Sequence, residues 1–132
     1  MRLPLLLLAS VTLWGGTLYQ VSGLGGYGGN SSVAFAVNSA GQATGTATTA
    51  NGTNVAFRST GTPTTLGANA QADDINAGGT VAGTRTTGNG SPRATVWQGN
   101  VATDILDFDS WGLGINDAGA VSYTHLTLPT NR

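Results

Sequence analysis

The chain has 132 residues, of which only 8% are charged, and it carries 21 glycines and no cysteine. About a quarter of the residues are charged in a usual soluble domain, so hydroxyls and amides provide most of the polarity here. The length allows at most one small domain. Five basic residues against six acidic ones give no basic patch for nucleic acid. The lack of cysteine excludes disulfide bonds and thiolate metal sites.

The N-terminal segment MRLPLLLLASVTLWGG combines Arg2 with an apolar run from Leu3 to about Trp14. A membrane-spanning helix needs about 20 apolar residues, so this run is too short. Residues 1–16 are instead typical of a secretory leader. We therefore expect an exported protein, secreted or at the cell surface, with no membrane span after the leader is cleaved. A buried N-terminal strand is the alternative.

An internal repeat underlies the next hundred residues. The stretch VNSAGQATG at 37–45 returns as INAGGTVAG at 75–83 and begins again as INDAGAV at 115–121. Asn38, Asn76 and Asn116 are therefore 38 and 40 residues apart. Self-similarity at a fixed period decides the architecture of a chain. We expect a preceding strand and Gly-rich loop at 17–32, repeat units at 33–66 and 67–106, and the start of a third unit at 107–120.

Each unit has the pattern of four short strands. Val33, Phe35 and Val37 alternate with smaller or polar residues, as in a half-buried strand. The turns NSAG and ANGT follow, where Asn and Gly take left-handed backbone angles easily. Pro63 begins the fourth segment and suits an edge strand. The sequence predicts an all-β fold of antiparallel four-stranded units.

A four-stranded unit of about 40 residues is the size of a β-propeller blade. Because propellers close with about four to eight blades, we expect an incomplete β-propeller and a fragment of a longer protein. A structural β-solenoid stalk, built from stacked parallel coils, is an alternative.

The pattern Ile/Val-Asn-x-x-Gly-x-x-x-Gly, followed by an Asn-Gly turn and an Ala-Phe strand, resembles the HAF-repeat family of predicted bacterial extracellular proteins. The resemblance covers about residues 19–120. The His-Ala-Phe triplet of the family appears here as Val55-Ala56-Phe57 and as Arg93-Ala94-Thr95, so its histidine is absent twice. The resemblance implies a secreted or surface repeat protein without an assigned reaction.

Gly45 and Gly83 occupy matching positions in the second strand of their units. We expect that a side chain there would collide with a neighbouring strand. A glycine that cradles a ligand is the alternative. No lysine is present to complete a phosphate-binding loop.

Asp73 occupies the position filled by Phe35 in the first unit and Leu113 in the third. An aspartate on a core face is costly unless it is paired or bound to a metal. A cation or ligand site is one hypothesis. The favoured one is a shifted or weakened strand that leaves the carboxylate in water.

Asp107 and Asp109 form the sequence DFDS, which resembles the start of a calcium loop but lacks the glycine and the bidentate glutamate of such a loop. A solvated loop between units is favoured. The same pair could serve as the acid and base of a glycosidase, although nothing in the sequence fixes their separation.

His125 is the only histidine, so a Ser-His-Asp triad would have to use it, and no Gly-x-Ser-x-Gly elbow accompanies it. Trp97 and Trp111 could form a carbohydrate platform, but at strand positions we expect them in the core. Three glycosylation sequons begin at Asn30, Asn51 and Asn89. The last two coincide with expected hairpin turns.

The tail VSYTHLTLPTNR at 121–132 lacks the glycine and the threonine run that the repeat spacing predicts after Ala120. Residues 121–130 closely resemble a translation of the transposase adapter used in sequencing libraries. We therefore expect a non-native tail, with a natural C-terminal strand as the alternative.

The sequence thus predicts a binding, adhesion or structural role, no enzymatic activity and no metal or cofactor. The partner is an unknown surface ligand or a carbohydrate, and the oligomeric state stays open. The alternative is a fragment of a secreted propeller-type polysaccharide hydrolase.

Overall fold

The computed structural model describes residue 23 and residues 26–127, and every described element is a β-strand. The predicted leader at 1–16 and most of the strand expected before the first repeat lie outside these residues. The first sheet contains β1 (Gly28–Val37), β2 (Ala43–Thr49), β3 (Asn54–Ser59) and β4 (Pro63–Ala68). The second contains β5 (Ala70–Ile75), β6 (Val81–Thr86), β7 (Pro92–Gln98) and β8 (Val101–Asp104). A two-stranded sheet of β9 (Ser110–Ile115) and β10 (Val121–His125) follows.

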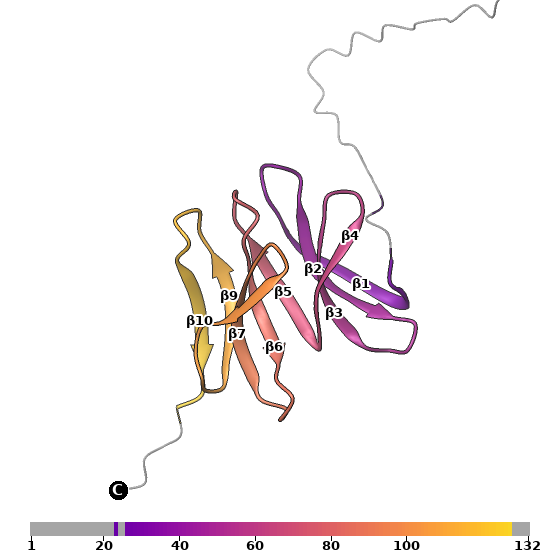
Figure 1. Ribbon diagram of the computed structural model, residues 1–132. Helices are drawn as coiled ribbons and strands as arrows, with labels where there is room; N and C mark the ends of the chain where they lie inside the picture. The colour runs from indigo at the N-terminus through magenta and orange to yellow at the C-terminus, as the bar shows by residue number, and fades with distance from the viewer. Residues whose placement is uncertain (1–22, 24–25, 128–132) are drawn as a thin grey trace, which may run out of the picture.

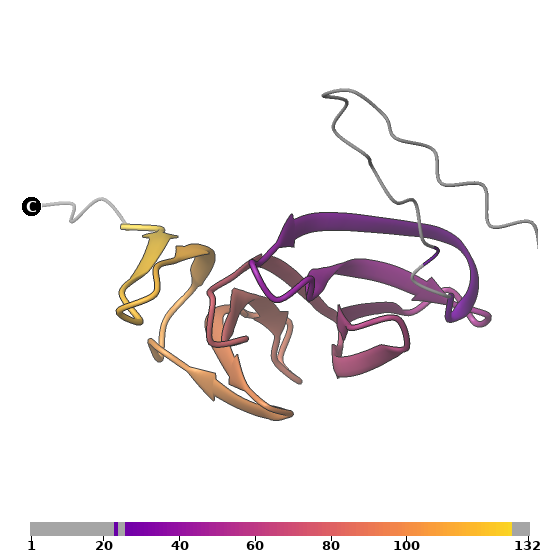
Figure 2. The same ribbon diagram turned by 90° about the horizontal axis from the view of Figure 1, so that it is seen from above.

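Each four-stranded sheet is a meander in which consecutive strands pair antiparallel. The three sheets follow one another in chain order, with the second sheet between the other two (Figures 1 and 2). The first strand of each later sheet lies against the sheet before it: β5 contacts β1, β2 and β3, and β9 contacts β5, β6 and β7. The prediction of all-β, antiparallel four-stranded units is confirmed. The parallel coils of a β-solenoid are excluded for the described residues.

The main core lies between the first and second sheets. Trp97 and Val81 are fully buried there, and Ile75 joins them from β5. A smaller cluster of Ala47, Val55 and Phe57 lies under Tyr27. The expectation that Trp97 belongs to the core is confirmed.

The hairpin turns place only the glycine in the left-handed region, whereas the sequence suggested it for both Asn and Gly. In the Asn51 turn, the Gly52 amide donates to the Thr49 carbonyl and the Thr49 amide donates to the Thr53 carbonyl. Gly52 has a φ of 82°, whereas Asn51 is not in the left-handed region. This is a three-residue loop in which only its last residue takes a positive φ. Four further turns repeat this hydrogen-bond pattern, with positive φ at Gly41, Gly79, Gly90 and Gly119.

A β-bulge recurs in the first strand of every unit, and the sequence did not reveal it. The register shifts at Phe35 in β1, at Asp73 in β5 and at Leu113 in β9. These are the three positions that the repeat makes equivalent. A bulge inserts an unpaired residue and breaks the inward-outward alternation. The position can therefore hold a phenylalanine, an aspartate or a leucine.

The glycines paired beside the first two bulges have no room for a side chain. A Cβ on Gly83 would overlap the Gln71 carbonyl oxygen and lie 2.9 Å from the Ala72 Cα. A Cβ on Gly45 would overlap the Val33 carbonyl oxygen in the same way. The predicted collision with the neighbouring strand is confirmed.

Part of the expected non-native tail forms β10, which pairs with β9. By the repeat spacing, Tyr123 stands where Gly45 and Gly83 stand in the earlier units, and it pairs with Gly112. Strand pairing tests the backbone and not the origin of the sequence, so the non-native tail stays a prediction. Residues 128–132 lie outside the described residues.

Candidate functional site

The repeated asparagine organises the turn that follows the first strand of each unit. Asn76 Oδ1 accepts from the Thr80 amide at 2.9 Å, and Asn116 Oδ1 accepts from the Ala120 amide at 2.8 Å. Asn38 Oδ1 accepts from the amides of Ala40 and Gln42 at 3.1 and 2.9 Å. In each turn the asparagine side chain thus supplies the acceptor for a backbone amide on the far side of the loop.

The same asparagines also join one unit to the next. Asn38 Nδ2 donates to the Asn76 carbonyl at 2.9 Å, and Asn76 Nδ2 donates to the Asn116 carbonyl at 3.2 Å. We call this pair of contacts the asparagine ladder. The sequence interpretation gave these residues a turn-forming role only. Their recurrence at spacings of 38 and 40 residues was the available signal for a second role.

Two aspartates reinforce the junction between the second and third sheets. Asp74 Oδ2 accepts from the Ile115 amide at 2.8 Å, and Asp117 Oδ1 accepts from the Ala77 amide at 2.8 Å. Charge-assisted hydrogen bonds of this kind are stronger than neutral ones. Both carboxylates therefore have structural partners.

Asp73 lies at the bulge of β5 and is partly exposed. Its Oδ1 accepts from Gln71 Nε2 at 2.6 Å. Burial raises the pKa of Asp73, and the negative charge of Asp74 raises it further against the opposing effect of the Gln71 hydrogen bond. The expected shift is found, as a bulge in β5 that leaves the carboxylate partly exposed, but the expected weakening is not, because β1 has the same bulge at Phe35 and both strands keep their pairing. The described residues contain no group of three acidic or histidine side chains placed to hold a metal.

Asp107 and Asp109 lie in the loop between β8 and β9. Asp109 Oδ1 forms an ion pair with Arg93 Nη1 at 2.9 Å, and Asp107 lines a hollow beside Arg93 and Asp104. The expected loop between units is found at this place. Asp109 therefore has a structural partner in Arg93.

Asp104 forms the second ion pair of this region, and this pair has two hydrogen bonds where the pair of Arg93 and Asp109 has one. Arg85 Nε and Nη2 donate to its two carboxylate oxygens at 2.6 and 2.7 Å, and Thr95 Oγ1 donates at 2.9 Å. The Arg85 hydrogen bonds hold the pKa of Asp104 below its usual value, although burial acts in the opposite direction. Such a bidentate pair fixes β8 against the middle of its own sheet.

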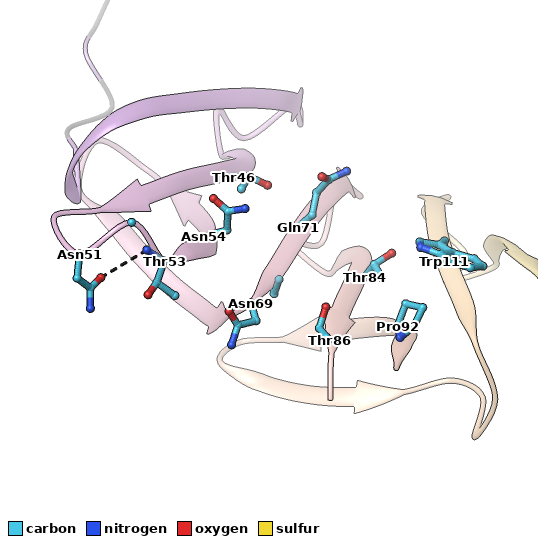
Figure 3. A pocket seen from close by; sticks show the side chains of 12 residues that line it. Thr46, Asn51, Thr53, Asn54, Asn69, Gln71, Thr84, Thr86, Pro92 and Trp111 are labelled. Carbon is cyan, nitrogen blue, oxygen red and sulfur yellow. Dashed lines mark hydrogen bonds between the residues drawn. The ribbon is translucent and has the colours of Figure 1, made fainter. Parts of the chain in front are cut away.

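A groove of about 590 Å³ runs along the junction of the first and second sheets (Figure 3). Its lining is uncharged and consists of amides, hydroxyls, small residues and one aromatic ring. The polar and aromatic side chains include those of Thr46, Asn54, Asn69, Gln71, Thr84 and Trp111. Trp111 lies at one end of the labelled side chains and Asn51 at the other (Figure 3).

Two observations distinguish this groove from an ordinary surface crease. The Thr46 hydroxyl is buried and has no hydrogen-bond partner among the described residues. Asn69, between β4 and β5, has a φ of 50° and is the one described non-glycine residue with a positive φ. Its carbonyl accepts from the Thr86 amide, and its amide donates to the Asn54 carbonyl. The groove wall is therefore fixed by backbone contacts between units.

Trp111 differs from its expected place in the core. It is only partly buried and lines the groove. The position five residues before the repeated asparagine is also exposed in the other units, at Val33 and Gln71. A tryptophan at this position therefore remains accessible.

The sequon asparagines in the turns have internal hydrogen bonds. Asn51 Oδ1 accepts from the hydroxyl of Thr49, and Asn89 Oδ1 accepts from the Ser91 amide at 3.2 Å. These contacts account for the residues as turn elements, as expected. Asn30 lies exposed in β1.

His125 lies in β10 beside two aromatic rings, with centroid distances of 5.5 Å to Phe108 and 5.9 Å to Tyr123. Among the described residues it has no hydrogen bond to a serine or an aspartate. The geometry does not assemble a triad around it.

Within the described part of the chain, no helix is long and apolar enough to cross a membrane. The chain matches no family model, no curated protein and no solved structure. The resemblance to HAF repeats therefore rests on the sequence motif alone.

Proposed function

We propose that the chain is part of a secreted or cell-surface β-repeat protein that binds an uncharged, hydroxyl-rich ligand, a carbohydrate being the fitting class. The groove beside β5 is the observation that carries this proposal. Its amides and hydroxyls offer both donors and acceptors, and none of its lining residues is charged. Trp111, which lines the groove and is partly exposed, supplies an aromatic ring of the kind that stacks on apolar faces of small ligands.

The proposed architecture is an incomplete β-propeller. Support comes from the successive four-stranded meanders and from β5 and β9, which lie against the preceding sheet. Export is supported by the leader-like composition of residues 1–16. Fusion of residues 1–32 to a reporter that is active only after export tests the localisation, and an inactive reporter contradicts it.

Glycan-array binding followed by calorimetry tests the ligand proposal. We expect binding to one or more neutral glycans and a loss of affinity of about tenfold in Trp111→Ala, the order expected when a stacked aromatic contact is removed. Phe108→Ala is the matched control, because Phe108 is 44% exposed and does not line the groove. Absence of binding to any neutral glycan, or an equal loss in both variants, contradicts the proposal.

The alternative function is polysaccharide hydrolysis in the complete protein. Asp73 favours it, because its raised pKa is a property of general acids. Release of reducing sugar from neutral and acidic polysaccharides is the measurement. Turnover that disappears in Asp73→Asn supports hydrolysis, and bound glycan without turnover supports the binding role.

A further inference from the structure

The lining of the groove contains the same three positions of the repeat twice. In each set, one residue follows the glycine beside the bulge, one begins the third strand of the same unit, and one is the second residue of the next unit's first strand. We call the first set, Thr46, Asn54 and Gln71, the polar set, and the second set, Thr84, Pro92 and Trp111, the aromatic set. The groove therefore repeats with the units.

Each set lies across one junction between units. The polar set takes two residues from the first unit and one from the second, and the aromatic set takes two from the second unit and one from the third. Both sets line one groove together with Asn69 and Thr86, and the Asn69 carbonyl accepts from the Thr86 amide at 2.8 Å. The two sets follow one another along the groove (Figure 3). A ligand that extends along the groove therefore meets first one set and then the other.

The two sets offer different chemistry to a ligand. In the polar set, Asn54 and Gln71 are exposed and carry amide groups, which donate and accept hydrogen bonds. The Gln71 Nε2 donates to Asp73 Oδ1 at 2.6 Å, which leaves the side-chain oxygen of Gln71 as an acceptor. In the aromatic set, Pro92 and Trp111 contribute a pyrrolidine ring and an indole ring. The polar set therefore suits hydroxyl groups, and the aromatic set suits the apolar face of a ring.

The accessibility of Trp111 is a property of its position in the repeat. Gln71 holds the same position in β5, and it is exposed even though β5 contacts strands of the sheets on both sides. All the described residues that line the groove lie between positions 46 and 111, before the tail at 121–132. The arrangement of two sets therefore depends only on residues of the repeat.

We infer that the groove binds a linear neutral glycan, with one sugar at the polar set and a following sugar at the aromatic set. Packed sheets lie about 10 Å apart, which exceeds the width of one sugar ring, so a single sugar reaches only one set. Each sugar of a linear glycan has hydroxyls around its edge and C–H groups on its faces. One sugar can therefore hydrogen-bond to Asn54 and Gln71 while another stacks on Trp111. The inference rests on the proposed carbohydrate binding and adds the length and the linear form of the ligand.

Calorimetry with oligosaccharides of increasing length tests the inference. The probes are cello-, xylo-, malto- and laminari-oligosaccharides, each from the monosaccharide to the hexasaccharide. In a series that binds, we expect the affinity to rise about tenfold or more with length, the gain for one added stacked or hydrogen-bonded sugar. Asn54→Ala and Trp111→Ala each remove a contact of one set, so each should bind the hexasaccharide about tenfold more weakly. Asn100→Ala is the matched control for Asn54→Ala, because Asn100 is exposed and does not line the groove.

The length series separates a failure of the inference from a failure of the proposed function, with circular dichroism to confirm that each variant keeps its β-structure. A monosaccharide that binds as tightly as its hexasaccharide overturns the inference and leaves the proposed carbohydrate binding intact. So does an Asn54→Ala variant that binds the hexasaccharide as well as Asn100→Ala does, because one set would then suffice. If no neutral glycan of the panel binds, the proposed function fails and the inference fails with it.

Discussion

Replacing Asn76 by alanine should weaken the fold more than the same change at Asn116. Asn76→Ala removes the bond from the Thr80 amide at 2.9 Å and the bond to the Asn116 carbonyl at 3.2 Å. Asn116→Ala removes only the bond from the Ala120 amide among the described contacts. At about 1 kcal/mol for each hydrogen bond, the expected losses in unfolding free energy are about 2 and about 1 kcal/mol.

Urea unfolding followed by circular dichroism measures both losses, provided that the slope of the transition is unchanged. A third variant, Asn76→Asp, keeps the oxygen that accepts from Thr80 and loses the donor that reaches Asn116. It should therefore be less stable than the unmodified chain. Equal stability of Asn76→Ala and Asn116→Ala would refute the role of the ladder. An Asn76→Asp variant as stable as the unmodified chain would do the same.

Three further substitutions probe other features. Gly83→Ala should cost about 3 kcal/mol because its Cβ would lie 2.9 Å from the Ala72 Cα, whereas Gly88→Ala, with open space, should be neutral in the same urea titration. Asp73→Asn should stabilise the fold at neutral pH, because the raised pKa of Asp73 means that folding disfavours its charged form. This gain in unfolding free energy should vanish as the pH falls below 3.8, the ordinary pKa of an aspartate, because the side chain is then neutral in both the folded and the unfolded chain. A gain that does not change with pH would contradict this reasoning. Asp104→Asn should lose less than about 1 kcal/mol of ion-pair stability. The stability difference between Asp104→Asn and the unmodified chain should be fully present above pH 3.8, the ordinary pKa of an aspartate. It should disappear as the pH falls through the lowered pKa of Asp104, and thermal unfolding at several pH values measures it.

The strand content of the fold could be predicted because its signals are local. Alternation at Val33, Phe35 and Val37 indicated a strand from neighbouring residues alone, but the expected half-burial is wrong, because all three side chains are at least 48% exposed and a bulge at Phe35 interrupts the alternation. The glycines at the turns also act within a few residues. Pro63 begins an edge strand, as expected, because an edge strand tolerates the missing amide. Repetition of these local signals was enough to predict four-stranded antiparallel units.

The junctions between units could not be predicted in the same way. Both the ladder from Asn38 to Asn76 and the contact of Asp74 with the Ile115 amide join residues about 40 positions apart. Nothing in the residues beside them reveals such a partner. The bulge at Asp73 was missed for a related reason, since the sequence shows an interrupted alternation but not which residue is unpaired.

The candidate groove was the least predictable feature. Its wall combines Thr46 from the first unit, Gln71 from the second and Trp111 from the third. No short sequence motif contains all three. The tryptophan was noticed, but its exposure depends on which face of β9 meets the preceding sheet.

The strictly sequential order of the strands has a consequence for how the chain reaches its fold. Every strand pair within a sheet joins neighbours along the chain, so each pairing closes only a short loop and loses little chain entropy. Contacts between sheets span about one repeat and require that the sheets exist first. Folding should therefore proceed hairpin by hairpin within each unit and then by stacking of finished neighbours, as in a one-dimensional array. Folding can begin at any unit, including the β1–β4 sheet while the chain is still leaving the ribosome.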